Sequence, residues 1–375
     1  MSAHRIFLRP GSYRSIVRLA ALAASVACLP PAAAAELAQA SGSSSPVCPR
    51  GRPTSANVDR YPSLITLQLD NDLFAGTDRD YTSGIKLTWV SSEIDRYRSD
   101  PCLPIWFNRL SGFLAGLPAR NLDSRNMSFS FGQAIYTPTH RQAVQPPSER
   151  PYAGWLYVGV GVSARDERHL ESIELNIGVV GPRAYGQQAQ DLFHNFEGYP
   201  RFLGWPNQLS NELGVQLVKE WRTRYSLPEA APGAHAEFIP HYGVSVGNVA
   251  TYANAGFDLR TGDSLPNDFG TAAIRPAAES LALPTDSSRS AGSGLHGFLT
   301  FDTRAVARNI FLDGSTFRDS AKVNKRPLVS EIALGMSWRW SGGRISYAHS
   351  FRSKEYYGQA TAQSFGTVSI TLEQP

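Results

Sequence analysis

The sequence predicts an all-β protein: an antiparallel transmembrane β-barrel of about twelve strands, with a short helical segment in an extracellular loop. Three observations support this prediction. Long segments alternate apolar with polar or glycine residues, the N-terminus is typical of an export signal, and no later run approaches about 18 apolar residues. A soluble β-sandwich would alternate too, but the export signal, the strand length and the small or polar second face favour a membrane barrel.

The N-terminus carries the features of an export signal. Four arginines, the last of them Arg18, precede an apolar run over residues 19–29, and small residues allow cleavage after Ala35 or Ala40. We therefore expect three parts: a signal peptide at 1–35 that is removed, a flexible periplasmic leader at 36–60, and an outer-membrane barrel domain at 61–375.

The charge balance argues against a nucleic-acid partner. Lys and Arg number 36 against 32 Asp and Glu, and the excess of four equals the four arginines of the signal segment. The remaining chain is therefore close to neutral and has no excess of basic residues with which to attract a polyanion.

Twelve segments show the alternation expected of strands. Near residue 175, for example, Ile173, Leu175, Ile177 and Val179 alternate with serine, glutamate, asparagine and glycine. We predict strands near residues 62–70, 80–91, 125–135, 153–164, 169–181, 212–225, 235–247, 249–261, 295–309, 327–341, 344–356 and 363–373.

An even number of strands places both ends of a barrel on the periplasmic side. The loops after odd-numbered strands are then extracellular, and three of them, 71–80, 136–152 and 182–211, hold most of the unusual polar residues. The loop 262–294 would be periplasmic, although turns on that side are usually short.

Two cysteines remain after the signal segment, Cys48 and Cys102, and both fall on the predicted periplasmic side. In an exported chain they are expected to form a disulfide, with two free thiols as the alternative. Within the signal segment, Cys28 is a candidate for lipid attachment, but Ser25 stands where such signals prefer leucine, so simple cleavage is favoured.

Oxygen-bearing side chains gather at the tip of the first hairpin, in the stretch LDNDLFAGTDRDYTSGIKLTW. Because Leu69 has outward parity, Asp72 has inward parity, and in the second strand Thr82 and Lys86 share it. The sequence thus predicts that Asp72, Thr82 and Lys86 meet at the mouth of the lumen. Clustered carboxylate and amide oxygens suit a calcium ion (Ca²⁺), and ordinary Asp and Asn turn chemistry is the alternative.

The segment GQQAQDLFHNF in the third extracellular loop predicts a short helix that places Gln190 and His194 on one face. Histidine is the natural general base near neutral pH. An ordinary surface histidine is the alternative for His194, and His140 in the second rim loop is a weaker candidate. The segment around Ser245 matches G-x-S-x-G, but it lies within a strand with no helix after it, so we do not expect a nucleophile there.

Several motifs together resemble those of the LpxR-type outer-membrane lipid A 3′-O-deacylases. In order they are DNDLFAGTDRDYTSG, QAIYTP, ERPYAGWLY, GVVGP, GQQAQDLFH and GWPNQLSNE, and they span residues 62–220. The resemblance implies a twelve-stranded barrel that hydrolyses the ester holding the 3′ acyloxyacyl chain of lipid A in the outer leaflet, with Ca²⁺ as cofactor.

The resemblance also implies roles for individual residues. Asn71 and Asp72 would form the metal and oxyanion site with Thr82 beside them, and Gln190 and His194 would lie on the opposing loop, with His194 as the base that activates water. The outward parity of Asn71 is unusual for such a role, unless a bulge or the end of the strand re-aims it.

The basic residues Lys86, Arg141 and Arg150 near the rim are expected to pair with the phosphates of lipid A. We expect a monomer in the outer membrane, with its site at the extracellular rim. Two other classes remain open: a non-enzymatic barrel, either a porin or a structural protein, and a barrel phospholipase with a serine nucleophile.

Overall fold

The computed structural model describes residues 63–72, 80–94, 124–231, 233–270 and 293–374, together with residues 109, 114 and 122. The predicted signal peptide and leader, the predicted disulfide between Cys48 and Cys102, and the hairpin tip at 73–79 lie outside the described residues. Of residues 80–82 only the backbone is described.

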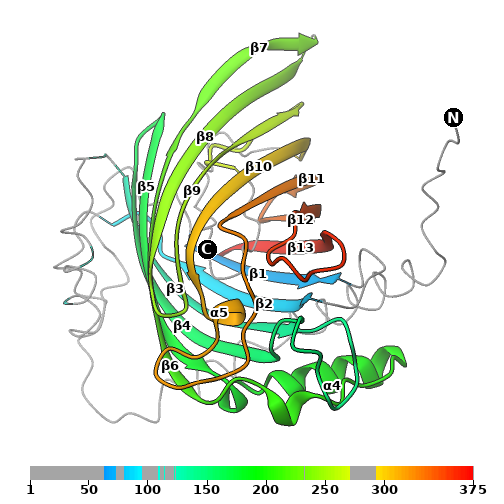
Figure 1. Cartoon of the computed structure of the whole chain (residues 1–375). Helices are drawn as coiled ribbons and strands as arrows, with labels where there is room; N and C mark the ends of the chain where they lie inside the picture. The colour runs from blue at the N-terminus through cyan, green and yellow to red at the C-terminus, as the bar shows by residue number, and fades with distance from the viewer. Residues whose placement is uncertain are drawn as a thin grey trace, which may run out of the picture.

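Antiparallel strands make up most of the described chain, and they confirm the predicted all-β class (Figure 1). Among the predicted strands, the largest shift of a boundary is at the end of β12, which stops at Arg352 rather than at residue 356. The strands are β1 (Ser63–Asn71), β2 (Asp80–Val90), β3 (Ser124–Thr137), β4 (Ala153–Arg165), β5 (His169–Val180), β6 (Glu212–Thr223), β7 (Tyr225–Ala231), β8 (Ala234–Gly247), β9 (Ala250–Gly262), β10 (Gly294–Asn309), β11 (Leu328–Trp340), β12 (Gly343–Arg352) and β13 (Gln363–Gln374).

The strands close into a ring. Apart from β6 and β7, consecutive strands pair as antiparallel neighbours. In addition, β6 pairs with β8, and β1 pairs with β13 in a register that sets Ser63 beside Gln374. After Arg224 the chain of β6 continues as β7, which pairs only with β8, so the closed barrel has twelve strands. β7 extends past the end of β5, so its second edge has no neighbour among the described strands. The register shift after Leu227 coincides with Pro228, and because proline has no N–H, it discourages another strand from pairing there.

The predicted inward and outward faces are confirmed in the first hairpin. In β2, Ile85 and Leu87 are exposed on the outside, whereas Lys86 is buried inside, and in β1 the inward Thr66 and Gln68 are buried. Outward apolar and inward polar residues are the pattern of an outer-membrane barrel. Among the described residues, no helix is long and apolar enough to span a bilayer.

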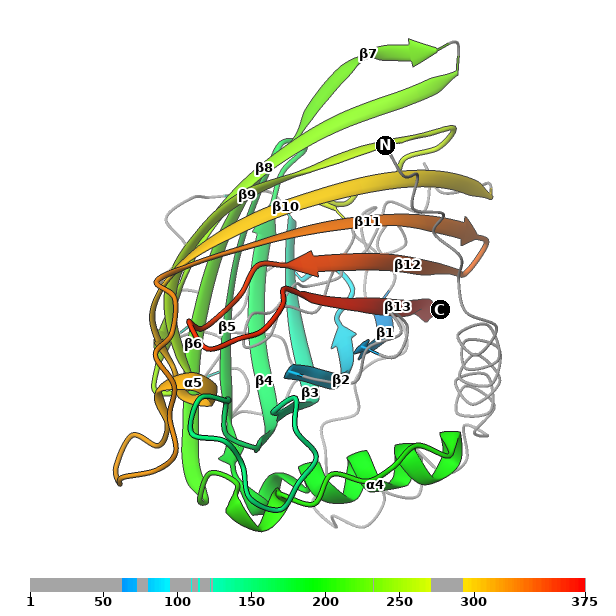
Figure 2. The same cartoon turned by 45° about the vertical axis from the view of Figure 1, so that its right-hand side comes forward.

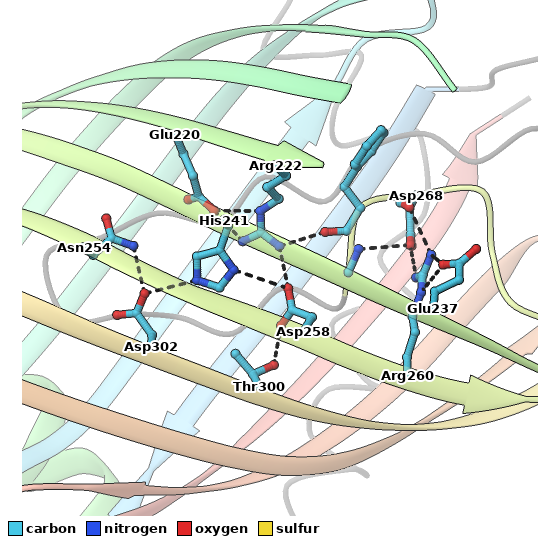
Figure 3. A network of polar contacts seen from close by, with 12 residues as sticks. Glu220, Arg222, Glu237, His241, Asn254, Asp258, Arg260, Asp268, Thr300 and Asp302 are labelled. Atoms are coloured by element: carbon cyan, nitrogen blue, oxygen red, sulfur yellow. Dashed lines mark hydrogen bonds and ion pairs between the residues drawn. The ribbon is translucent and has the colours of Figure 1, made fainter. Parts of the chain in front are cut away.

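Ion pairs and hydrogen bonds fill the interior of the barrel along β6 and β8–β10 (Figure 3). Arg222 is bonded to Glu220 at 2.6 Å and to Asp258 at 3.0 Å. The ring of His241 lies between Asp258, at 3.8 Å, and Asp302, at 3.2 Å. All these side chains are buried, so this part of the lumen is packed with protein groups that neutralise one another.

The described part of the long periplasmic loop, residues 263–270, folds into the barrel. Asp268 forms an ion pair with Arg260 of β9 (Figure 3). It forms another with Arg344 of β12, and the Phe269 carbonyl accepts a hydrogen bond from Arg222. Burial alone would raise the pKa of the Asp268 carboxyl, but the two guanidinium groups hold that pKa well below its ordinary value. The first residues of this loop therefore link β6, β9 and β12 inside the barrel.

Candidate active site between helix α4 and the barrel wall

The third extracellular loop contains the helix that the sequence predicts. A short 3-10 helix, η2 (Pro182–Ala184), leads into α4 (Gly186–Glu197), and a second one, η3 (Trp205–Asn207), leads back to β6. The helix α4 ends at Gly198, whose left-handed conformation (φ 77°) lets its N–H bond to the carbonyl oxygen of His194. Figures 1 and 2 show α4 at the end of the barrel opposite to β7.

This loop packs on the outer face of the barrel. Ile135 follows the exposed Phe129 and Phe131 on the outward side of β3, yet it is buried against Tyr152, Phe202 and Trp205. The aromatic residues of the loop thus cover, near the rim, a strand face that lower down is exposed.

Close backbone contact fixes the start of α4 against β4. A Cβ atom on the outward-facing Gly154 would lie 3.0 Å from the Cβ of Ala184 and 3.3 Å from the Cα of Gly186. The side chain of Gln133 donates a 2.6 Å hydrogen bond to the carbonyl oxygen of Ala184. Only glycine at position 154 allows the helix to approach the wall so closely.

His194 is buried, and a hydrogen bond to the segment after the helix orients its ring. Its Nδ1 lies 2.7 Å from the carbonyl oxygen of Pro200. Because a carbonyl oxygen only accepts, Nδ1 must carry the proton, and in the neutral imidazole the lone pair is then on Nε2. The rings of Phe202 and Tyr199 meet the imidazole edge-on at centroid distances of 5.7 and 6.1 Å. This arrangement holds His194 in the tautomer that a general base acting through Nε2 requires.

Gln190, one turn before His194, is oriented by Trp205. The indole Nε1–H donates a 2.7 Å hydrogen bond to Oε1 of Gln190. Since an indole nitrogen can only donate, the amide oxygen must face Trp205 and the Nε2 end must face away. That Nε2 atom is buried without a hydrogen-bond partner among the described residues. A buried donor of this kind is expected to serve a purpose, because leaving it unpaired costs about 1–3 kcal/mol.

Asn71 lies on the same side of the wall as α4. The strand register places Asn71 beside Ser83, Ser83 beside Ile135, and Ile135 beside Gly154, and residues paired in this way share one face of a sheet. At about 4.8 Å per strand, Asn71 is about 10 Å from the strand residue that the α4 loop covers. The outward parity of Asn71, unusual for a site within the lumen, is what a site on the outer face requires.

Asp72 follows Asn71 just past the end of β1, where strand alternation no longer fixes the side that a residue faces, and both side chains are buried. Thr82 lies on the neighbouring β2, but its side chain is outside the described part of the structure. A carboxylate and an amide oxygen in sequence are hard donors of the type that Ca²⁺ prefers, so the donor chemistry fits this ion. Within the described residues, no group of three or more His, Cys, Asp or Glu side chains could hold a metal by itself.

The structure corrects the expectation that Lys86 lies near His194 at the rim as a phosphate ligand. Lys86 points into the barrel, where its Nζ lies 3.7 Å from Oε1 of the buried Glu174. The helix α4 packs on the outward faces of Ile135 and Gly154. Lys86 and His194 are thus on opposite sides of the same wall, because the period-2 alternation separates neighbouring residues.

Arg150 is fully buried inside the rim rather than at the surface expected for a phosphate ligand. Its guanidinium lies 3.0 Å from Glu355 and stacks over the ring of Tyr136 at 5.0 Å. Burial raises the pKa of Glu355, but Arg150, Arg352 and Arg304 outweigh it and hold that pKa below its ordinary value. The described contacts of Arg150 are therefore those of a structural ion pair.

Arg141, in contrast, lies partly exposed beside the candidate site. Its guanidinium is 5.2 Å from the ring centre of Phe202, the same ring that contacts His194. The alternative histidine, His140, is exposed and paired with Glu149, and its carbonyl oxygen accepts a hydrogen bond from Tyr152. Of the three basic residues predicted to meet phosphates, Arg141 is the one that the structure brings near His194.

Sequence reasoning missed Trp205, Phe202 and Pro200, which orient the two residues of α4. The segment GYPRFLGWPN is rich in aromatic residues for an extracellular loop, and that composition is the signal that could have indicated a packed cluster. Ser245 lies within β8 as expected, and its hydroxyl donates to the Ala250 carbonyl and accepts from Gln216, both at 3.0 Å.

Comparisons with known proteins agree with this architecture. The family model described as Outer membrane protein LpxR matches residues 19–373. LpxR from Salmonella typhimurium is similar in structure, with a TM-score of 0.65 at 20% identity, over 83% of this chain and 100% of that one.

Two autotransporter barrels are more distant. The β domain of Bordetella Brka has a TM-score of 0.41 at 8% identity, over 84% of this chain and 99% of that one. The translocator domain of NalP from Neisseria meningitidis has a TM-score of 0.33 at 8% identity, over 85% and 91%. No curated protein matches the sequence. The family match, which spans nearly the whole chain, shows that this protein belongs to the LpxR family of outer-membrane β-barrels.

Proposed function

We propose that this protein is a lipid A deacylase, which hydrolyses the ester that holds the 3′ acyloxyacyl chain of lipid A in the outer leaflet. One observation carries the proposal: a buried histidine, His194, is fixed through Nδ1 by the Pro200 carbonyl, on a helix that packs against the lipid-facing side of the wall. The resemblance of the motifs to lipid A 3′-O-deacylases supports the choice of substrate.

In the proposed reaction His194 acts as general base. Its Nε2 takes a proton from a water molecule, and the water oxygen attacks the carbonyl carbon of the ester. When the ester C–O bond breaks, the imidazolium returns the proton to the leaving sugar oxygen. The products are the free acyloxyacyl acid and a lipid A with a hydroxyl at the 3′ position. The Pro200 carbonyl stabilises the imidazolium that forms in between.

Gln190 contributes a hydrogen-bond donor to this proposal. Because Trp205 holds its amide oxygen, the Nε2 hydrogens face away from the indole. We assign to them the carbonyl oxygen of the ester, on which negative charge develops as water attacks.

Asn71 and Asp72 would hold a Ca²⁺ ion, with Thr82 beside them. The ion would supply Lewis-acid stabilisation of the developing negative charge. Arg141, carried on the ring of Phe202 next to His194, is the residue we assign to a phosphate of the substrate.

Mass spectrometry of lipid A from cells that express the protein tests this function. We expect the loss of one acyloxyacyl chain with the intact protein, and no loss with His194→Ala at equal expression. Removal of Ca²⁺ by a chelator should stop the reaction, and adding Ca²⁺ should restore it. Unchanged lipid A in the presence of Ca²⁺ and folded, unsubstituted protein would contradict the proposal.

Two observations favour this function over the two alternatives. Inward side chains of the described strands are buried against one another, which does not favour a porin. The hydroxyl of Ser245, in the one G-x-S-x-G match, is engaged inside the barrel, which does not favour it as a nucleophile. A serine-directed reagent distinguishes the mechanisms, because it should leave a water-attack enzyme active.

A further inference from the structure

One sector of α4 is apolar, and half of it is exposed in the described part of the structure. It comprises Ala189, Leu192, Phe193 and Phe196, which recur at the spacing of a helix face. Ala189 and Phe193 are partly buried, Ala189 against the cluster that covers Ile135, whereas Leu192 is 71% exposed and Phe196 is 50% exposed. Leu203, just after the Phe202 that contacts His194, is 62% exposed. Large apolar residues that cluster in this way mark an interaction surface.

The position of α4 identifies what this surface meets. On β3 the outward face passes from the exposed Phe131 to Ile135, which the α4 loop covers, over four residues or about 13 Å. On β4 it passes in the same way from the exposed Val158 to Gly154, which contacts the loop. The exposed apolar residues of these strands form the belt that faces lipid in an outer-membrane barrel.

The α4 loop therefore covers the outward strand faces near the rim, whereas lipid covers the same faces farther from the rim. Its inner side touches the wall, and Leu192 and Phe196 remain exposed on the helix that packs beside this belt. The remainder of the exposed helix surface is polar, with Gln188 and Asn195. A helix with one apolar and one polar side is suited to lie in the plane of a membrane interface.

From this arrangement we propose that Leu192, Phe196 and Leu203 form a lipid-docking surface, which seats α4 among the acyl chains of the outer leaflet. The occupant is a lipid hydrocarbon chain. The docking requires no reaction, whereas its use as the path by which an acyl chain reaches His194 rests on the proposed function.

Photocrosslinking in native membranes tests the docking. A benzophenone side chain is introduced at position 192 or 196, and also at 131 in the belt and at 188 on the polar side of α4. The benzophenone inserts into nearby C–H bonds, and mass spectrometry identifies the adducts. We expect lipid adducts at 192 and 196 in yields similar to those at 131, and at least about fivefold above those at 188, because only the apolar sector would lie among acyl chains.

Two outcomes would overturn the docking surface: yields at 192 and 196 no higher than at 188, or adducts that join two copies of this chain. The same measurement in the His194→Ala background separates this inference from the proposed function. Lipid adducts that persist there support docking even if the chain shows no deacylase activity.

A substitution pair tests the path of entry. The double change Leu192→Asn and Phe196→Asn should lower the turnover of lipid A in membranes by about tenfold, because the lost apolar surface weakens the seating of the helix. The matched control, Gln188→Asn, should leave turnover unchanged. Equal turnover in both variants, with benzophenone adducts present, would mean that the helix docks but that the acyl chain enters elsewhere, and would overturn the path.

Discussion

The Nδ1–H of His194 donates a 2.7 Å hydrogen bond to the carbonyl oxygen of Pro200, across the end of α4. This contact separates the structural role of the side chain from its proposed chemical role, because the two ring nitrogens do different things. His194→Asn retains an N–H near the Nδ1 position but has no group at Nε2. We expect it to preserve thermal stability while hydrolysis falls by at least about a hundredfold. Full activity in folded His194→Asn would show that His194 is not the general base.

Trp205 is expected to act on catalysis through Gln190. Trp205→Phe keeps most of the packing but deletes the indole N–H, which frees the Gln190 amide to turn over. We expect kcat to fall by about tenfold to a hundredfold with KM nearly unchanged, because the lost donor acts in the transition state. Trp155→Phe, an identical change at another fully buried tryptophan, is the control for packing. Equal effects of the two substitutions would reduce Trp205 to a packing residue.

Gly154 controls how closely α4 approaches the wall. Gly154→Val would place methyl groups against Ala184 and Gly186, which even a single Cβ atom would approach to 3.0 and 3.3 Å. We expect hydrolysis to fall by at least about tenfold, because displacement of α4 by 1 Å misplaces its residues, while the barrel still forms. Gly297→Ala, whose Cβ would meet only the Gly335 carbonyl oxygen at 3.8 Å, should be silent. Heat-modifiable mobility in gels reports barrel formation in both variants.

The ion pair between Arg150 and Glu355 should stabilise the extracellular end of the barrel. Removal of one partner by Arg150→Met leaves the buried carboxylate with only the weaker influence of Arg352 and Arg304, so we expect a loss of at most about 3–5 kcal/mol, the typical cost of breaking a buried pair. The double variant with Glu355→Gln should recover much of this loss. Urea titration monitored by tryptophan fluorescence provides the measurement, and an unchanged midpoint in the single variant would contradict the expectation.

The same pair has a predictable pH dependence. The pKa of Glu355 is lower in the folded protein than its ordinary value, so the folded state binds fewer protons on this group than the unfolded state does. Its stabilising contribution is therefore complete above the ordinary carboxyl pKa and is lost as the pH falls through the folded value. Glu355→Gln should flatten the acid limb of the stability profile, and a profile that remained equally steep would show that other carboxyls govern it.

The packed lumen should not conduct ions. Inward residues such as Lys86 and Asp302 are buried against neighbouring side chains, and Asp268 ties the periplasmic loop across the interior. We expect purified protein in planar bilayers to give no stable conductance steps at 100 mV, unlike an open porin of similar strand number. Regular steps that scale with salt concentration would contradict this expectation.

Much of the barrel was predictable because alternation in each strand specifies which residues face lipid. The exposed Leu87 and the buried Lys86 are adjacent, and the period of 2 assigned both correctly. The extension β7 was not predicted as a strand, because Pro228 lies within it and proline argues against a strand unless the strand is at an edge.

The side of the wall on which the site lies was not predictable in the same way. Alternation says which way Asn71 points, but it does not say over which face a distant loop folds. That choice depends on contacts such as Trp205 with Gln190 and Gly186 with Gly154, which join residues through tertiary packing alone. In the sequence, the outward parity of Asn71 was the one indication that the site lies on the outer face of the wall. It can be interpreted in this way only when the position of α4 is known.

The pairing of β1 with β13 brings the first and last described strand residues, Ser63 and Gln374, side by side. The closed ring could therefore begin at another strand, and a circular permutant of the barrel domain is feasible. A short linker from Gln374 to Ser63, with new termini in the turn at Ser341–Gly342, would leave α4 and the strands beneath it contiguous in the chain. Such a permutant would let the order in which the strands are synthesised be varied while the folded ring stays the same.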